Sequence, residues 1–319
     1  MSSPSAKRQR TEHASITRSN IWYRDGSVVL QTESTQFRVH WGLLSQHSPF
    51  FRDLENIPQP PDEPTIDGCP IVELQDSAVD VEHLLTALYD PTFLSQTALP
   101  LAIVGALIRL GRKYDFKNLL DSAVARLTFQ NPTTLEEYDN LIADGNYNLT
   151  RITSYPGYAL DLLTLARENN LGLVLPVAYY RALICDPLQL LEGTKMSGEK
   201  LASLSVDDLY RCLIGRQKLV TKQYQPGYTL GWLREWPYTD CRNPEGCGAK
   251  RKLKFHSYMD RNTVKAFVMV PSEQRAIPGI CATCHQHVTE SINEGRKKMW
   301  EELPGFFDLP PWNELKNDL

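Results

Sequence analysis

The chain has 319 residues, of which 42% are hydrophobic and 23% charged, with 34 basic and 38 acidic side chains and a formal net charge of −4. This balance is typical of a folded globular protein and excludes a wholly disordered chain, and the near-neutral charge argues against a dedicated nucleic-acid binder. The length indicates about two domains, with room for a small third. Seven cysteines are too few for a disulfide scaffold of this size but sufficient for one metal site.

The N-terminal segment 1–20 is polar and lacks the apolar core of a signal peptide. No segment of the chain reaches the ~18 apolar residues that a membrane span needs. We therefore expect an intracellular protein, cytoplasmic or nuclear or both, with no membrane partner and with reduced thiols. Residues 1–20 are expected to be a disordered tail, in which Lys7, Arg8 and Arg10 are either solvated charges or a nuclear import signal.

Residues 25–39 predict a β-hairpin, because the β-rich DGSVVLQ and the alternating QFRVH flank the polar turn TEST. One helical segment should follow between Leu43 and Phe51, where apolar side chains recur at roughly helical spacing. The proline-rich stretch 58–64 predicts a surface loop, and CPIVEL at 69–74 predicts a short apolar strand.

A helix should begin at Asp76 and Ser77 and end at Pro91, since one apolar face recurs between Val81 and Leu88. Two more amphipathic helices are expected at 102–114 and 116–128. From Thr133 to about Tyr224 the pattern is helical, and we assign 131–230 to an all-helical middle region. The sequences Thr134–Glu137 and Ser205–Asp208 are typical of helix starts, where a hydroxyl caps exposed amides.

A set of short motifs occurs in order across the first third of the chain. They are Asp25 with Val28–Leu30, Phe37–His40, Leu43–Leu44, Ser48–Phe51, Leu54, Val72–Asp76, Leu84–Tyr89 and Leu107–Tyr114. Taken together, residues 25–128 resemble a BTB/POZ domain. The layout of the whole chain, including CATC near the C-terminus and the run from Gly295 to Trp312, is similar to BTB proteins that abound in mushroom-forming fungi. We therefore assign residues 21–130 to a BTB/POZ domain, a short β-sheet flanked by helices, in an α+β chain.

The resemblance implies a non-enzymatic protein-interaction module, often a homodimer and sometimes a substrate adaptor for a cullin ubiquitin ligase. The motif residues carried over are Asp25, Phe37, Val39, His40, Leu44, Ser48, Phe50, Phe51, Tyr89 and Tyr114. We expect the apolar members to be core residues, each contributing ~2 kcal/mol when buried. Asp25 and His40 should hydrogen-bond or pair in a partly buried pocket. Dimer formation in the family depends on an N-terminal strand, for which Ile21–Tyr23 is the candidate.

The segment 231–319 holds four of the six tryptophans and four of the seven cysteines, which indicates a compact Cys/Trp-rich unit. Its cysteines form a C-x5-C pair and a C-x2-C pair, and a C-x2-C turn directs two thiolates at one tetrahedral ion. KLKFHSYM and TVKAFVMV, on either side of residues 260–262, predict a hairpin between the pairs. The order thiol pair, hairpin, thiol pair, helix resembles a treble-clef zinc layout.

The expected ligands of a structural zinc ion are Cys241, Cys247, Cys281 and Cys284, with His256, His285 and His287 as alternates. In the competing interpretation the four cysteines are ordinary small buried residues and no metal is bound. Cys69, Cys185 and Cys212 lie in unrelated segments and should be unpaired thiols.

The function we favour from the sequence is protein recruitment by the BTB/POZ domain. The alternative is a transcription-related BTB regulator whose basic run Lys250–Lys254, beside the zinc unit, contacts nucleic acid, although a basic run is usually a solvated face. The sequence contains no G-x-S-x-G, Walker loop or glycine-rich dinucleotide turn, which disfavours an enzyme.

Overall fold

The computed structural model describes residues 16–57, 64–90, 92–143, 146–195, 201–236, 239–260, 263–269 and 278–319. The described residues form two compact units, the first drawn from Met1–Thr97 and Ala102–Val124 and the second from Ala98–Leu101 and Ala125–Leu319. The architecture is mixed α+β, as the sequence predicts. Helices predominate in the second unit, and none of the described helices is both long enough and apolar enough to cross a membrane.

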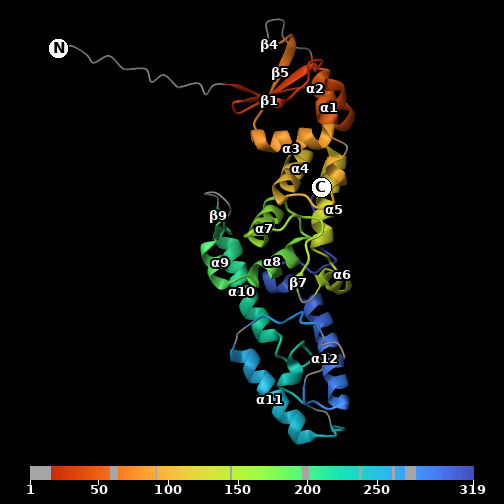
Figure 1. The fold of residues 1–319 in the computed structure, drawn as a ribbon, viewed down its shortest axis with the longest axis vertical. Coiled ribbons are helices and arrows are strands. Elements are labelled where there is room, and N and C mark those ends of the chain that lie inside the picture. Colours follow the sequence, from red (N-terminus) through yellow and green to blue (C-terminus); the bar gives the residue numbers. More distant parts are fainter. Residues whose placement is uncertain are drawn as a thin grey trace, which may run out of the picture. The chain divides into compact units, whose positions relative to one another are not determined.

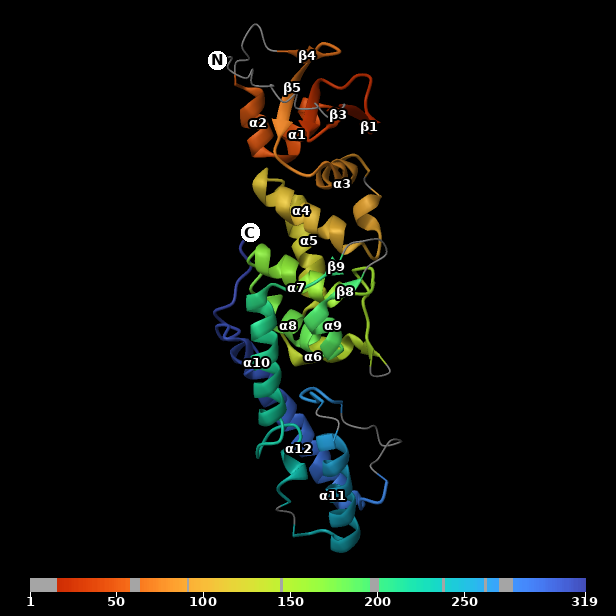
Figure 2. The same ribbon diagram turned by 90° about the vertical axis from the view of Figure 1, so that its left-hand side faces the viewer.

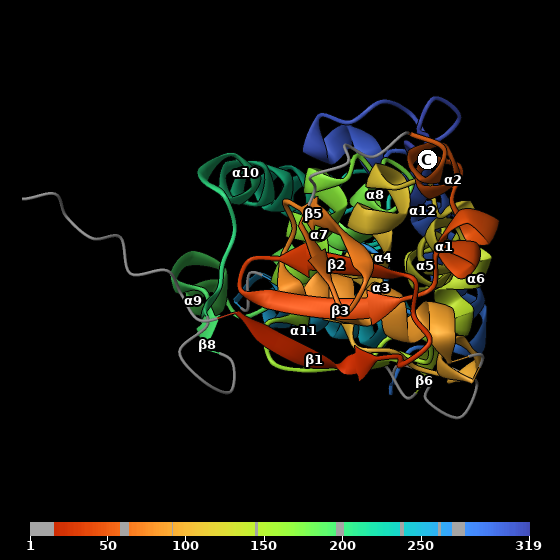
Figure 3. The same ribbon diagram turned by 90° about the horizontal axis from the view of Figure 1, so that it is seen from above.

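The first unit contains a five-stranded sheet. Its strands are β1 (Thr17–Trp22), β2 (Val28–Thr32), β3 (Thr35–Val39), β4 (Thr65–Ile66) and β5 (Cys69–Leu74). They lie in the order β1-β3-β2-β5-β4, and Figure 3 shows the first four of these side by side. β2 and β3 are antiparallel, with Val28 opposite Val39 and Thr32 opposite Thr35, so the predicted hairpin is confirmed. β1 begins at Thr17, ahead of the boundary expected at residue 21.

The centre of the sheet explains the apolar run in β2. This strand pairs with β3 on one side and in parallel with β5 on the other, and Val28, Val29 and Leu30 are all buried. A strand covered on both faces has no solvent-facing side, so consecutive apolar residues replace the usual alternation. The CPIVEL strand is confirmed as β5, whose first and last residues are buried.

Helices make up the rest of the first unit (Figure 1). They are α1 (Trp41–His47), α2 (Pro49–Glu55), α3 (Ala78–Tyr89), the 3-10 turn η1 (Phe93–Ser95), α4 (Leu101–Lys113) and α5 (Lys117–Gln130), of which α5 continues into the second unit. The helices predicted between Asp76 and Pro91, at 102–114 and at 116–128 are therefore present. Pro91 and the proline-rich residues 58–63 lie outside the described part of the chain.

The helical segment expected between Leu43 and Phe51 is present, but it is divided at Ser48 into two helices, α1 and α2. Ser48 has an extended backbone (φ −139°, ψ 113°) and precedes Pro49, the first residue of α2. A residue before proline is kept out of the helical region by the proline ring. The hydroxyl of Ser48 then accepts a hydrogen bond from the Phe51 amide at 3.1 Å and caps the new helix.

The second unit is built mainly of helices. They are α6 (Leu135–Asn140), α7 (Tyr158–Glu168), α8 (Leu175–Leu183), α9 (Pro187–Glu192), α10 (Val206–Lys222), η2 (Gly231–Leu233), α11 (Pro244–Asp260), α12 (Ala282–Glu301) and η4 (Pro304–Phe307). Its short strands are β6 (Ile142–Ala143), β7 (Asn146–Tyr147), β8 (Thr194–Lys195) and β9 (Leu201–Ala202), in two antiparallel pairs. The middle region is therefore helical but not all-helical, since these short pairs connect its helices.

Both predicted caps are present. The hydroxyl of Thr134 accepts from the Glu137 amide at 3.3 Å, and that of Ser205 accepts from the Asp208 amide at 3.1 Å. Asp208 is buried, and its carboxylate accepts a hydrogen bond from the Tyr179 hydroxyl and pairs with Arg167 at 3.1 Å. The start of α10 is thereby fixed to α7 and α8.

The hairpin expected between the two cysteine pairs is wrong, because 244–260 form the helix α11. The Asn243 side-chain oxygen accepts from the Gly246 amide at 3.1 Å, and the Asn243 carbonyl accepts from the Cys247 amide, which are the bonds of a helix start. KLKFHSYM alternates over a few residues, and this suggested a strand. The inward side chains of α11 instead follow helical spacing, at Arg251, Phe255 and Tyr258.

Candidate functional site

A polar and aromatic cluster joins three of the motif residues in the first unit. The Tyr89 hydroxyl accepts from the His40 amide at 2.8 Å and lies 3.0 Å from His40 Nδ1, while His40 Nε2 lies 3.3 Å from Asp25 Oδ1. Tyr23, which the motif analysis missed, stacks on the Tyr89 ring with centroids 4.5 Å apart. The cluster ties the end of α3 to the junction between β3 and α1, so its geometry is that of a structural clamp.

The electrostatics of this clamp follow from its exposure. Burial raises the pKa of Tyr89 to about 12, so the phenol stays protonated at neutral pH. The pKa of the Asp25 carboxyl lies below its usual range because a backbone amide and then the His40 ring hydrogen-bond to it. The Asp25 side chain is 84% exposed, so this pair is solvated and is poorly suited to catalysis.

The second group of motif residues surrounds the start of α2. Ser48 is fully buried, and its hydroxyl donates to the Tyr114 carbonyl at 2.5 Å while it caps α2. The Phe51 and Tyr114 rings lie 5.5 Å apart, and the Tyr114 hydroxyl donates to Asp76. Phe37, Val39 and Leu44 are fully buried, as expected of core residues. The expectation that Phe50 is also core is wrong, since this side chain is 42% exposed on the outer side of α2.

The four C-terminal cysteines converge in the second unit, although two distant segments supply them. The sulfurs of Cys241, Cys247, Cys281 and Cys284 all lie within 4.8 Å of one another. Cys247 is in the first turn of α11, Cys281 is the residue before α12, and Cys284 is in the first turn of α12. Cys247 and Cys284 are fully buried, whereas Cys241 and Cys281 are partly exposed. Figures 1 and 2 both draw α11 and α12 alongside each other.

Backbone amides point at these sulfurs, because two helices begin beside the cluster. The Cys281 amide donates to Cys247 Sγ at 3.2 Å. The backbone amides of Cys284 and Arg242 lower the pKa of Cys281 to about 6. Burial acts in the opposite direction and raises the pKa of Cys247 and Cys284. Helix N-termini stabilise thiolate through these amides and the helix dipole, and thiolate is the form that binds metal.

The three alternate ligands do not join the cluster, which consists of the four cysteines alone. His287 Nε2 lies 2.9 Å from the Asp240 carboxylate, so this histidine ties the residue before Cys241 to α12. His256 lies on the exposed side of α11, and His285 is in the first turn of α12. Cys69, Cys185 and Cys212 are free thiols outside the cluster, as predicted.

Four sulfurs at this spacing could hold one tetrahedral ion. Zinc binds thiolate at about 2.3 Å, which places the sulfurs of a regular tetrahedron about 3.8 Å apart. The observed limit of 4.8 Å is therefore within a small contraction of that geometry. Four thiolates around a dication carry a net charge of −2, and the cation Arg242 directly follows the ligand Cys241 in the sequence.

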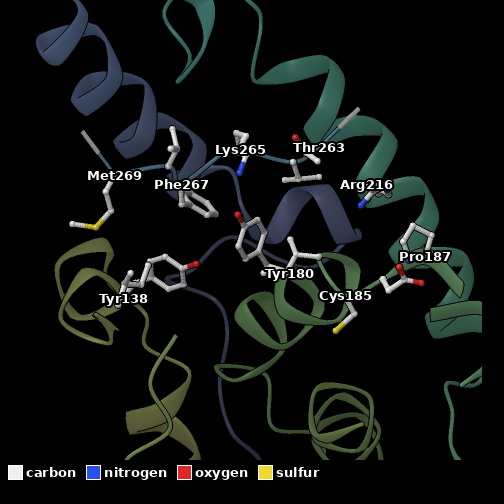
Figure 4. A pocket seen from close by; sticks show the side chains of 14 residues that line it. Tyr138, Tyr180, Cys185, Pro187, Arg216, Thr263, Lys265, Phe267 and Met269 are labelled. Atoms are coloured by element: carbon white, nitrogen blue, oxygen red, sulfur yellow. The ribbon is translucent and has the colours of Figure 1, made fainter. Parts of the chain in front are cut away.

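A cavity of about 640 Å³ opens in the second unit, with Tyr138, Tyr180, Cys185, Arg216 and Phe267 among its lining residues (Figure 4). Polar side chains that line this cavity hydrogen-bond to backbone groups of the protein and do not converge on one point where a ligand could be bound. Arg216 donates to the Leu183 carbonyl at 3.0 Å, and the Tyr180 hydroxyl bonds to the Phe267 backbone. Burial raises the pKa of the Cys185 thiol, which keeps it protonated and weakly nucleophilic at neutral pH.

Comparison with known proteins bears on the first unit. A family model of the BTB/POZ domain matches residues 24–130. No curated protein matches the chain. The matched segment contains strands β2 to β5, the clamp of Asp25, His40 and Tyr89 and the capped α2, in the order that the motifs predict. The chain is therefore a BTB/POZ domain-containing protein.

Proposed function

We propose that this chain is a non-enzymatic protein-interaction protein whose BTB/POZ domain forms a homodimer and recruits a cullin ubiquitin-ligase scaffold. The observation that carries the proposal is the BTB/POZ match over residues 24–130, because BTB/POZ domains are protein-interaction modules. The second unit would then select the protein delivered to the scaffold.

Homodimer formation is supported by the position of β1. This strand lies at the edge of the sheet and pairs only with β3 among the described strands. An exposed strand edge presents unpaired amides and carbonyls that a second chain can bind. Light scattering at micromolar concentration should give twice the 36.3 kDa of one chain, and a monomeric mass would contradict this part of the proposal.

Recruitment is supported by an apolar stripe on α2 and the turn after it. Phe50, Leu54 and Ile57 are spaced i, i+4 and i+7, with Phe50 and Ile57 exposed and Leu54 half-buried. Exposed apolar residues at this spacing form one face that a partner helix can cover.

A pull-down from a eukaryotic lysate, with the full chain as bait, tests recruitment. We expect a cullin in the recovered fraction and its loss with the variant F50S/I57S. The matched control is Val79→Ser, which removes an exposed apolar side chain from α3 instead and should leave recovery unchanged. Equal recovery by all three baits would refute the role of the α2 face, and no cullin with any bait would refute the adaptor proposal.

We further propose that the four cysteines bind one structural zinc ion that joins α11 to α12. The donor set supports zinc, since four thiolates in a tetrahedral arrangement are typical of structural zinc sites and the helix-start amides stabilise those thiolates. No coordination position is left for a substrate, so the site would be structural.

Metal analysis of the purified full chain should find about one equivalent of zinc. The variant C247S/C284S should lose the metal, and chelation should loosen the packing of Trp232 in the neighbouring core. Cys185→Ser, which removes a cysteine outside the cluster, should retain it. Less than about a tenth of an equivalent in the wild-type chain, with no loss of structure on chelation, would refute the zinc site.

A further inference from the structure

The helix α11 carries four basic residues within five positions, and the structure separates them by role. The Arg251 guanidinium faces inward and donates to the carbonyls of Leu233 at 2.7 Å and Arg234 at 3.2 Å. Phe255 and Tyr258 lie on the same side of the helix as Arg251. The Phe255 ring packs edge-on against Tyr224, and Tyr258 is partly buried. Because each residue advances about 100° around a helix, positions 249, 252, 253 and 256 face outward, and the exposed positions 250 and 259 lie at the two opposite edges of this surface.

The outward surface combines basic charge with exposed apolar atoms. We define the α11 outer face as Lys250, Lys252, Leu253, His256 and Met259. Leu253 is 65% exposed and Met259 is 50% exposed, so apolar surface lies beside the basic side chains of this helix.

The lysines of this helix are not neutralised within the described part of the protein. Lys250, Lys252 and Lys254 form no ion pair with a carboxylate of any residue that the structure describes, and Lys254 lies over the Tyr258 ring instead. Lysines on the neighbouring helices differ. Lys218, Lys222 and Lys297 pair with Asp308, Glu302 and Glu294, respectively. The positive charge of α11 is therefore available to a partner.

We propose that the α11 outer face binds an acidic segment of a partner protein that also carries apolar side chains. Carboxylates of such a segment would pair with Lys250 and Lys252, and its apolar side chains would cover Leu253 and Met259. The inference rests on the proposed zinc site in that the ion would hold α11 against α12 and so present this face.

The same observations disfavour nucleic acid as the occupant. A phosphate backbone would satisfy the lysines but offers little apolar surface to Leu253 and Met259. Bases of a single strand stack on exposed aromatic rings, and the phenyl and phenol rings of α11, those of Phe255 and Tyr258, pack inward. The chain would thus have a second recruiting surface in addition to the one proposed for its BTB/POZ domain.

Fluorescence anisotropy with the full, zinc-loaded chain tests the proposal, using a labelled synthetic amphipathic peptide rich in Glu and Leu as the probe. We expect K250E/K252E to weaken peptide binding by about fivefold or more, since two attractive charge pairs become repulsive. L253S should weaken it by about threefold or more through lost apolar contact. The matched control K117E/K297E makes the same charge change at exposed lysines on other helices and should leave affinity within about twofold of the wild type.

The outcomes separate this proposal from the zinc site. Zinc content and far-UV circular dichroism, measured on each variant, should equal those of the wild type. A zinc-loaded chain that fails to bind the peptide, or equal binding by the wild type and K250E/K252E, would overturn the α11 proposal and leave the metal site standing. Duplex DNA that binds more tightly than the peptide and is insensitive to L253S would also overturn it. Peptide binding that persists after zinc is removed would overturn the dependence of this face on the ion, whereas metal analysis alone decides the zinc site.

Discussion

Gly295 lies in the middle of α12 and allows that helix to touch the backbone of another segment. A methyl group at this position would lie 2.3 Å from the Thr229 nitrogen and 2.3 Å from the Tyr228 carbonyl carbon. These are backbone atoms, so no side-chain rotation can relieve the clash. The segment is also held in place, because the buried Thr229 hydroxyl donates to the Ala266 carbonyl at 2.6 Å.

The variant Gly295→Ala should therefore destabilise the second unit despite the better helix propensity of alanine. That propensity favours the variant by about 1 kcal/mol. The helix would have to retreat by about 1 Å to restore ordinary contacts, and overpacking of this kind costs about 1–3 kcal/mol, with the upper end expected against rigid backbone. We expect a net loss of about 2 kcal/mol in the free energy of unfolding.

Gly248→Ala is the matched control, because Gly248 also lies inside a helix, α11, and its methyl group would meet no described atom within 4 Å. This variant should gain about 0.5–1 kcal/mol. Urea unfolding followed by tryptophan fluorescence and far-UV circular dichroism measures both changes, since four of the six tryptophans lie after residue 230. A Gly295→Ala protein as stable as the wild type, or two variants that shift in the same direction, would refute the argument from close backbone contact.

Three further predictions concern buried or paired polar groups. Ser48→Ala should lower the unfolding free energy by about 1–2 kcal/mol in urea titrations, because it removes a helix cap and the donor to the Tyr114 carbonyl, and an unchanged midpoint would contradict this. Tyr179→Phe should lower the unfolding free energy by about 1–3 kcal/mol, since the buried Asp208 carboxylate loses a hydroxyl donor. An unchanged melting temperature would contradict this prediction. The pKa of Asp25 is lower in the folded state than in the unfolded chain, so its contribution is present above the unfolded pKa near 4 and is lost as pH falls through the lower folded value. Asp25→Asn should accordingly flatten the acid limb of stability below about pH 4, and an acid limb identical to that of the wild type would refute the pairing.

Part of the candidate sites could be predicted because the signals are local. The order of short motifs located the BTB/POZ domain, and the two-residue spacing of Cys281 and Cys284 marked a thiol pair. The choice of ligands could not be made locally. His287 is as close in sequence to Cys284 as Cys281 is, but it pairs with Asp240 instead. Whether zinc occupies the four cysteines stays a prediction.

Other differences arose where one pattern fits two structures. The segment 252–259 satisfies short strand alternation and helical spacing alike, and only a cap at Asn243 together with inward packing at Arg251 and Phe255 favours the helix. Phe50 and Phe51 are equally apolar, so the sequence predicts that both are core residues. A surface helix buries only one of its sides, and the start of α2 after Ser48 determines that the Phe51 ring faces inward.

By itself, the sequence determined the elements whose cause is local: the β2–β3 hairpin, the helix starts at Thr134 and Ser205, and the break before Pro49, whose Ser-Pro signal was present although one helix was expected. Those features depend on backbone preferences and on hydrogen bonds between residues a few positions apart. Only the tertiary structure decided what lies together across long separations: Cys247 beside Cys281, 34 positions away, His40 on Tyr89, and Gly295 against Thr229. Such contacts depend on how whole helices pack, which is determined by the summed burial of many side chains rather than by any short segment.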